Sequence, residues 1–220
     1  MSRLAGRALA FVDSYASLLV LLLANFFLLE LVHSARWGAV GSTVLAAIAL
    51  VVAVSDRATG HTIRPVHWLL VGACVVFAAV VLLVESTRVL GIAYLMPVLL
   101  LVTATLPITI NRVLNHRRVT HETVLGALCV YVLLGLLFAF VYLATFELRD
   151  GPFFAQAGEH PQSEFLYFSF VTLTTLGFGD LSPAQGLPQA LVVLEALLGQ
   201  VFLVTLVARL VTLWGRSAER

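Results

Sequence analysis

The chain contains few charged residues and no lysine. Asp, Glu, Lys and Arg make up 11% of its 220 residues, and all 13 basic residues are arginine. Soluble domains usually carry about 25% charged residues, so this composition excludes a soluble protein. The arginines are scattered between apolar runs, which excludes a nucleic-acid partner. The absence of lysine is typical of a GC-rich coding genome and favours a bacterial source.

Residues that carry covalent or metal chemistry are also scarce. Cys74 and Cys129 both lie inside apolar runs, so buried, inert thiols are expected rather than a disulfide. His116, His121 and Glu122 form a loose cluster whose spacing matches no metal motif. No phosphate-binding loop and no nucleophile with a base at a recognisable spacing is present. We therefore expect neither an enzyme nor a cofactor.

Apolar residues, in contrast, make up 60% of the chain. A membrane-spanning helix needs roughly 20 mostly apolar residues. The first candidate has an alternative interpretation as a signal peptide, but no convincing small-residue cleavage site follows it. We expect an all-α membrane protein with six transmembrane helices. The six candidates are Ser17 to Val32, Ala39 to Ser55, Val66 to Val84, Val89 to Ile110, Thr123 to Phe146 and Leu187 to Leu213.

The arginines predict the orientation, because cytoplasmic loops hold the positive excess. With both termini inside, ten arginines lie on the cytoplasmic side and three outside, which indicates a multi-pass protein of the plasma membrane, in a bacterium its inner membrane. The inner set is Arg3, Arg7, Arg57, Arg64, Arg112, Arg117, Arg118, Arg209, Arg216 and Arg220, and the outer set is Arg36, Arg88 and Arg149. Acidic residues between Glu147 and Asp180 then lie outside, where they attract cations.

One loop contains a motif suited to binding a dehydrated cation. It reads Thr174, Thr175, Leu176, Gly177, Phe178, Gly179 and Asp180. Backbone carbonyls can replace the water shell of a potassium ion when successive carbonyls point toward one axis. That arrangement needs alternate residues in backbone regions that side chains disfavour, which suits Gly177 and Gly179. One strand cannot encircle an ion, so the motif implies four copies around an axis.

This run resembles the selectivity filter of the potassium-channel superfamily, and its Gly-Phe-Gly variant is similar to filters of two-pore-domain and some bacterial channels. The resemblance covers Thr120 to Arg216. It implies potassium sites at Thr175, Leu176, Gly177 and Phe178, no other cofactor, and a tetramer of identical subunits in a lipid bilayer. We expect Glu164 to Thr175 to form a re-entrant pore helix, capped by Ser163, because the segment is too short to span.

Two residues are candidates for supporting the filter. Tyr167 occupies a position where relatives often carry tryptophan, and we expect its hydroxyl to bond Asp180. Val171 stands where several relatives carry an acid, so the usual carboxyl pair with Asp180 is absent. Glu195, an ionisable residue inside a membrane helix, is a functional candidate. It has two open interpretations: a structural hydrogen bond behind the filter, or a role in gating or proton sensing.

The last helix carries two further features. Gly199 lies where the superfamily places a gating hinge, and the alternative is close helix packing. Residues that recur at three to four positions form a stripe that the resemblance assigns to the inner cavity. The stripe consists of Gln200, Leu203 or Val204, Val207 and Val211.

The domain division follows from these elements. Residues 1–16 are expected to be a cytoplasmic segment or interfacial helix, residues 17–112 a four-helix peripheral domain, and residues 113–220 the pore domain. Val89 to Ile110 contains no arginine, and Pro97 and Pro107 interrupt it. A voltage sensor needs repeated arginines in that helix, so weak or no voltage dependence is expected.

The sequence predicts a potassium-selective channel that conducts passively. Three alternatives stay open: a non-selective cation channel, a secondary transporter with broken helices, and a non-conducting subunit. The six segments show no clear inverted repeat, and the complete Gly-Phe-Gly favours potassium selectivity. The gating stimulus is not evident, although His160 near the outer mouth is the best-placed histidine for a pH response.

Overall fold

The protein is a bundle of long helices. The computed structural model describes residues 2–32, 34–54, 65–84, 86–107, 109–110 and 121–218. Within these ranges the structure is helical apart from loops and one isolated β-bridge. The helices are α1 (Ser2–Leu31), α2 (Ala35–Val54), α3 (Pro65–Leu83), α4 (Thr87–Leu100), the π-helical turn η2 (Leu101–Thr105), α6 (His121–Leu148), α7 (Gln162–Leu173) and α8 (Leu187–Ala218).

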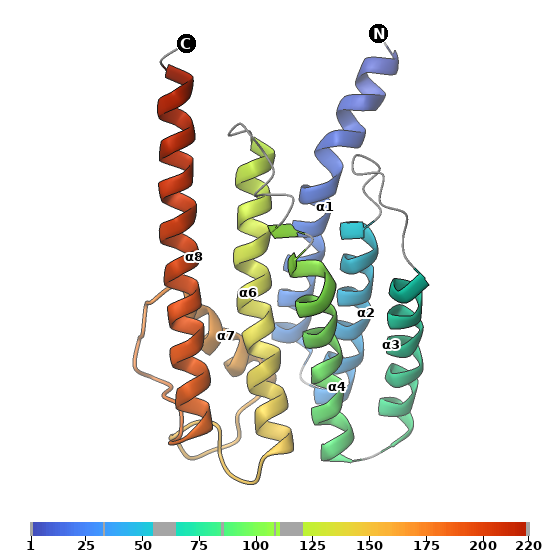
Figure 1. Cartoon of the computed structure of the whole chain (residues 1–220). Coiled ribbons are helices and arrows are strands. Elements are labelled where there is room, and N and C mark those ends of the chain that lie inside the picture. The colour runs from blue at the N-terminus through green and yellow to red at the C-terminus, as the bar shows by residue number, and fades with distance from the viewer. Residues whose placement is uncertain are drawn as a thin grey trace.

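The short helix α7 lies among the long ones (Figure 1) and contacts α1, α6 and α8. The long helices run side by side, and α1 begins at the same end of the molecule at which α8 ends. The loops on both sides of α7 return to the opposite end. A short helix with non-helical chain after it, held between long helices, is the arrangement expected for a re-entrant segment.

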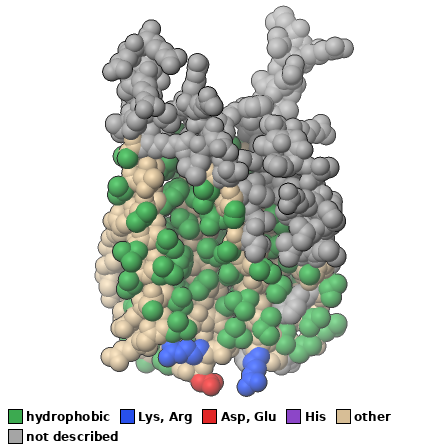
Figure 2. Space-filling model, viewed as in Figure 1, with side chains coloured by type: hydrophobic (Ala, Val, Ile, Leu, Met, Phe, Trp, Pro, Cys, Tyr) green, Lys and Arg blue, Asp and Glu red, His purple; other side chains and the backbone are tan. Residues whose placement is uncertain are grey.

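Two of the described helices, α6 and α8, are long and apolar enough to cross a membrane. Their candidate spans are Val124–Leu148 and Leu187–Ala208. Shorter apolar stretches occur in α1 to α4. Green hydrophobic side chains cover the flank of the described part, and the arginine and acidic side chains visible there lie at its lower edge (Figure 2). An apolar flank with charge at its rim suits a protein embedded in a bilayer.

One hydrophobic core joins the first four helices to the last three. It includes Leu22 from α1, Tyr94 from α4, Leu133 from α6 and Phe165 from α7, all nearly inaccessible to solvent. Both cysteines are buried and free, as expected, and Cys129 Sγ donates to the carbonyl of Tyr15 at 3.4 Å. The described helices α1 to α4 therefore share this core with α6 and α7, and α1 and α4 contact α6 directly.

The expected span from Ser17 to Val32 agrees with the apolar stretch Tyr15–Leu31, and the helix that contains it begins earlier, at Ser2. Residues 2–16 contain good helix formers and no proline, so the helix continues through the segment where an interfacial helix was one expectation. Two other expectations were wrong. The helix expected from Glu164 to Thr175 is α7, which runs from Gln162 to Leu173 with extended Pro161 at its N-cap position. Ser163 consequently lies inside the helix and caps nothing.

The second correction concerns the prolines of the fourth segment. Pro97 lies inside α4 and does not end it. The helix instead widens into the π-helical turn η2 just before Pro107, which lacks the N–H that a continuing α-helix requires. The backbone hydrogen bonds thus change from the α-helical to the π-helical pattern before Pro107, whereas α4 continues past Pro97.

Candidate functional site

The run from Thr174 to Asp180 follows α7, and three backbone hydrogen bonds connect its first residues to the last turn of that helix. The amides of Thr174, Thr175 and Leu176 donate to the carbonyls of Phe170, Thr172 and Val171, each at 3.0 Å. These bonds satisfy the last carbonyls of the helix, which otherwise lack partners. Among the described residues, no backbone hydrogen bond ties residues 177–180 to the helix.

The backbone of this run alternates in conformation. Thr175, Gly177 and Gly179 have φ values of +58°, +54° and +82°. Among the backbone hydrogen bonds of the described residues, none uses the carbonyl of Thr175, Leu176, Gly177 or Phe178 as an acceptor. A β-branched residue at positive φ is strained, and such strain is typical of functional sites. The glycine spacing indicated this alternation, but the sequence interpretation did not extend it back to Thr175.

Every residue from Thr174 to Asp180 is exposed in the isolated chain. Leu176 and Phe178 are 61% and 66% exposed. The Phe178 ring stacks on Tyr167, with centroids 6.3 Å apart and planes within 6°. One face of this ring is thus covered by Tyr167 of α7, and the rest is left for other contacts.

Tyr167 and Asp180 are hydrogen-bonded, as the sequence predicted. The Tyr167 hydroxyl donates to Asp180 Oδ2 at 2.7 Å. This bond lowers the pKa of the Asp180 carboxyl below its ordinary value, since it stabilises the charged form. A carboxylate is therefore held at the end of the run, with α7 and the 174–180 loop tied together.

Glu195 is completely buried and joins three helices. Its carboxyl group accepts hydrogen bonds from Tyr142 of α6 and, at 2.5 Å, from Ser169 Oγ of α7. Ser169 Oγ also lies 2.8 Å from the carbonyl oxygen of Gly135. Glu195 thus makes the buried hydrogen bonds that its structural interpretation requires, and a role in gating or proton sensing stays a prediction. The sequence analysis missed Tyr142 and Ser169, which no local pattern singles out.

Gly199 packs tightly on the end of α7. A Cβ atom at this glycine would lie 2.7 Å from Leu173 Cδ1 and 3.1 Å from the Leu173 carbonyl oxygen. That carbonyl accepts a hydrogen bond from Tyr131 at 2.9 Å. Helix α8 continues through Gly199 without a break. The close packing proposed for Gly199 is thus against Leu173 of α7, and its role as a hinge stays a prediction.

The rest of α8 has few partners within the chain. Its own-chain contacts follow a stripe of Glu195, Gly199, Phe202 and Leu206, whereas residues between them are largely exposed. Three expected cavity residues, Gln200, Leu203 and Val207, lie on the exposed surface, as does Val204. The side chain of Val211 lies outside the described residues. An apolar membrane helix that is mostly uncovered requires further partners or lipid.

Residues 131–214 match the family model Ion_trans_2, whose description is ion channel. This segment contains most of α6 and α8 together with α7 and the 174–180 run. The match points to an ion channel. It argues against an enzyme and agrees with a protein that is embedded in a membrane. No curated protein and no solved structure matches the chain significantly.

Substituting Tyr167 tests the bond at the outer end of the channel's 174–180 run. Tyr167→Phe removes the donor to Asp180 but retains the ring that stacks on Phe178. We expect faster loss of current during sustained opening, because the loop is then tied to α7 by one contact fewer. The measurement is the decay of current in planar bilayers. Decay kinetics identical to those of the unmodified channel would count against this role.

Substituting Gly199 tests the packing of α8 on the base of the same run. Gly199→Ala is expected to displace α8 from Leu173 and to change the open probability in single-channel records. Gly72→Ala is the matched control, because this helical glycine of α3 has no atom within 4 Å of the added Cβ. Unchanged open probability in both variants would exclude a gating role for Gly199.

Proposed function

We propose that the chain is the subunit of a potassium-selective channel that conducts potassium passively through a four-fold pore. The observation that carries this proposal is the alternating positive φ at Thr175, Gly177 and Gly179, together with backbone carbonyls that accept no backbone hydrogen bond. Carbonyl dipoles arranged in this way replace the hydration shell of potassium. Potassium would bind at Thr175, Leu176, Gly177 and Phe178, which form the filter in this proposal.

The homotetramer is supported by what the isolated chain leaves uncovered. The filter and most of α8 are exposed, and only several copies around an axis surround an ion. Three further identical subunits would cover Leu176, Phe178 and part of the α8 surface. Gln200, Leu203, Val207 and Val211 would then line the inner cavity.

The proposed topology has six membrane spans, both termini in the cytoplasm and the filter mouth outside. The arginine distribution supports this orientation, and the common end of α1 and α8 agrees with it. Residues 89–110 contain no arginine, so opening should depend weakly on voltage or not at all. The bacterial inner membrane is the proposed location, from the composition alone.

Reversal potentials of the purified protein in planar bilayers with unequal potassium and sodium test this function. The reversal potential is expected to follow the potassium gradient, at unitary rates far above transporter turnover. A potential that follows total cations would instead indicate a non-selective pore. Low, saturating transport would indicate a secondary transporter, and no current would indicate a non-conducting subunit.

A further inference from the structure

The loop before α7 is joined to the loop that follows the filter. Phe154 and Pro183 form an antiparallel β-bridge. On either side of it, the Ala155 amide donates to the Ser182 carbonyl and the Ala184 amide donates to the Phe153 carbonyl, each at 2.8 Å. The position of the chain just beyond Asp180 thus depends on the loop that precedes the pore helix.

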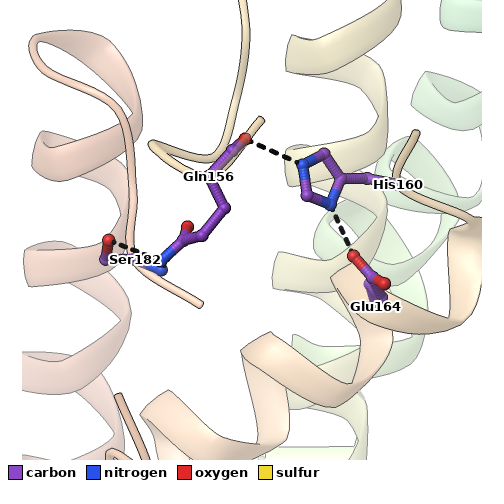
Figure 3. Close-up of polar contacts among 4 residues, drawn as sticks. All are labelled: Gln156, His160, Glu164 and Ser182. Carbon is purple, nitrogen blue, oxygen red and sulfur yellow. Dashed lines mark hydrogen bonds and ion pairs between the residues drawn. The ribbon is translucent and has the colours of Figure 1, made fainter. Parts of the chain in front are cut away.

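Gln156 strengthens this junction with its side chain (Figure 3). Its Nε2 donates to Ser182 Oγ at 3.1 Å, and its Oε1 accepts from the Ser182 amide at 3.0 Å. Ser182 lies two residues after Asp180. A displacement of Gln156 would therefore be transmitted to the outer end of the filter.

Both ring nitrogens of His160 face oxygen acceptors. Nε2 lies 3.1 Å from the carbonyl oxygen of Gln156, and Nδ1 lies 2.5 Å from Glu164 Oε2 in the first turn of α7 (Figure 3). The ring packs on Phe154, with centroids 4.8 Å apart, and its side chain is 10% exposed. A carbonyl and a carboxylate both accept, so only the doubly protonated imidazolium satisfies both contacts.

We propose that His160 is the external pH sensor of the filter, and this inference rests on the potassium-channel function proposed above. The imidazolium holds Gln156 to the pore helix and so keeps Ser182 and the filter mouth in the conducting arrangement. When the external solution becomes alkaline, the ring loses one proton and one of its two contacts. The junction loosens, and sustained current falls.

Neutral histidine cannot retain both contacts. If the hydrogen stays on Nε2, the lone pair of Nδ1 faces the Glu164 carboxylate, and if it moves to Nδ1, the lone pair of Nε2 faces the Gln156 carbonyl. Burial alone would lower the pKa of His160, but the hydrogen bonds to Glu164 and to Gln156 and the Glu164 charge together raise it. The stabilisation is therefore complete below the ordinary histidine pKa of about 6.5 and is lost as the pH rises through the raised value.

Glu164 is the charged group in contact with His160. The other charged groups on the neighbouring segments are exposed or only half-buried, and the first turn of α8 holds no acid. They are Asp150 and Glu159 in the loop, and Glu147 and Arg149 at the end of α6. Titration of the junction should therefore follow the His160 and Glu164 pair.

The test uses the full-length protein in planar bilayers, with the pH of one chamber changed at a time. We expect sustained potassium current to fall by at least about threefold as the pH of the filter-mouth chamber rises from about 6 to about 9, across the histidine range. The other chamber should have no such effect. His160→Gln should remove the dependence. Glu164→Gln should shift it to lower pH, because it removes the charge that favours the imidazolium.

Glu159→Gln is the matched control, because it removes an exposed acid next to His160 and should leave the dependence unchanged. Nitrogen NMR of the His160 ring, which requires no conduction, should give a midpoint above the ordinary histidine value. An ordinary or lower midpoint, or a pH dependence that persists in His160→Gln, overturns the sensor while the channel function stands. The absence of potassium current at every pH overturns the proposed function itself, and the sensor with it.

Discussion

Replacing Gly177 or Gly179 with alanine is expected to abolish potassium current while leaving the fold of the subunit intact. Both glycines have positive φ, at +54° and +82°, and neither has an atom within 4 Å of the position a Cβ would occupy. The added methyl group therefore meets no obstacle within the chain. The expected effect arises from the backbone, which an alanine residue biases toward negative φ and a different carbonyl direction.

The size of the effect follows from symmetry. A left-handed conformation costs a residue with a side chain about 1–2 kcal/mol, and four copies around one pore bring the total to about 4–8 kcal/mol. That is enough to depopulate the conducting arrangement by roughly 700-fold or more, since each 1.4 kcal/mol is a factor of ten. Reversal-potential and unitary-current recordings measure the loss.

Gly151→Ala is the matched control for the filter glycines. Gly151 also has positive φ, at +122°, and open space around it, but it lies just after α6 and outside the junction of Gln156, His160 and Ser182. This variant should retain conduction, although its backbone is strained as well. Normal potassium selectivity and current in Gly177→Ala would refute the assignment of these carbonyls as ion ligands.

The second large effect is expected at Glu195. Glu195→Ala removes the acceptor of the Tyr142 hydroxyl and leaves Ser169 with only the Gly135 carbonyl. An unpaired buried hydroxyl costs about 1–3 kcal/mol, and the cavity left by the side chain adds to this. We expect a lower thermal unfolding temperature in detergent and a reduced potassium over sodium permeability ratio, because α7 holds the filter.

A double-mutant cycle separates this network from general destabilisation. Ser169→Ala should reduce stability in the unmodified protein but much less in the Glu195→Ala background, since the two residues act through one contact. Glu159→Ala, at an exposed acid in the outer loop, should change neither stability nor permeability. Additive effects of Ser169→Ala and Glu195→Ala would contradict the network.

The sequence predicted the helices and the non-helical run from Thr174 to Asp180, because both depend on local pattern. The apolar runs correspond to helices α1 to α4, α6 and α8. The glycine spacing identifies the run that follows α7. The bond from Tyr167 to Asp180 was also predicted correctly, from the position of Tyr167 in the resemblance to potassium channels. Local pattern and this resemblance were sufficient for these features.

Contacts between distant segments were not predictable in the same way. Tyr142 and Ser169 lie 53 and 26 residues from Glu195, and neither residue type marks a partner for a buried acid. Helix α1 begins at Ser2, before the expected span from Ser17, because hydropathy marks only the apolar part of a helix. Thr175 at positive φ was missed because a β-branched residue is a poor candidate for that conformation.

The shared core of the two halves has a consequence for how this chain can be divided. The Phe26 ring of α1 meets Phe170 of α7 edge to face, with centroids 5.3 Å apart, and Cys129 of α6 bonds to Tyr15 of α1. Helices α1 to α4 therefore cannot move as a separate domain without breaking these contacts. Deleting them would expose the apolar surfaces of α6 and α7 that they cover. Chimeras that replace these four helices with those of another protein are expected not to fold.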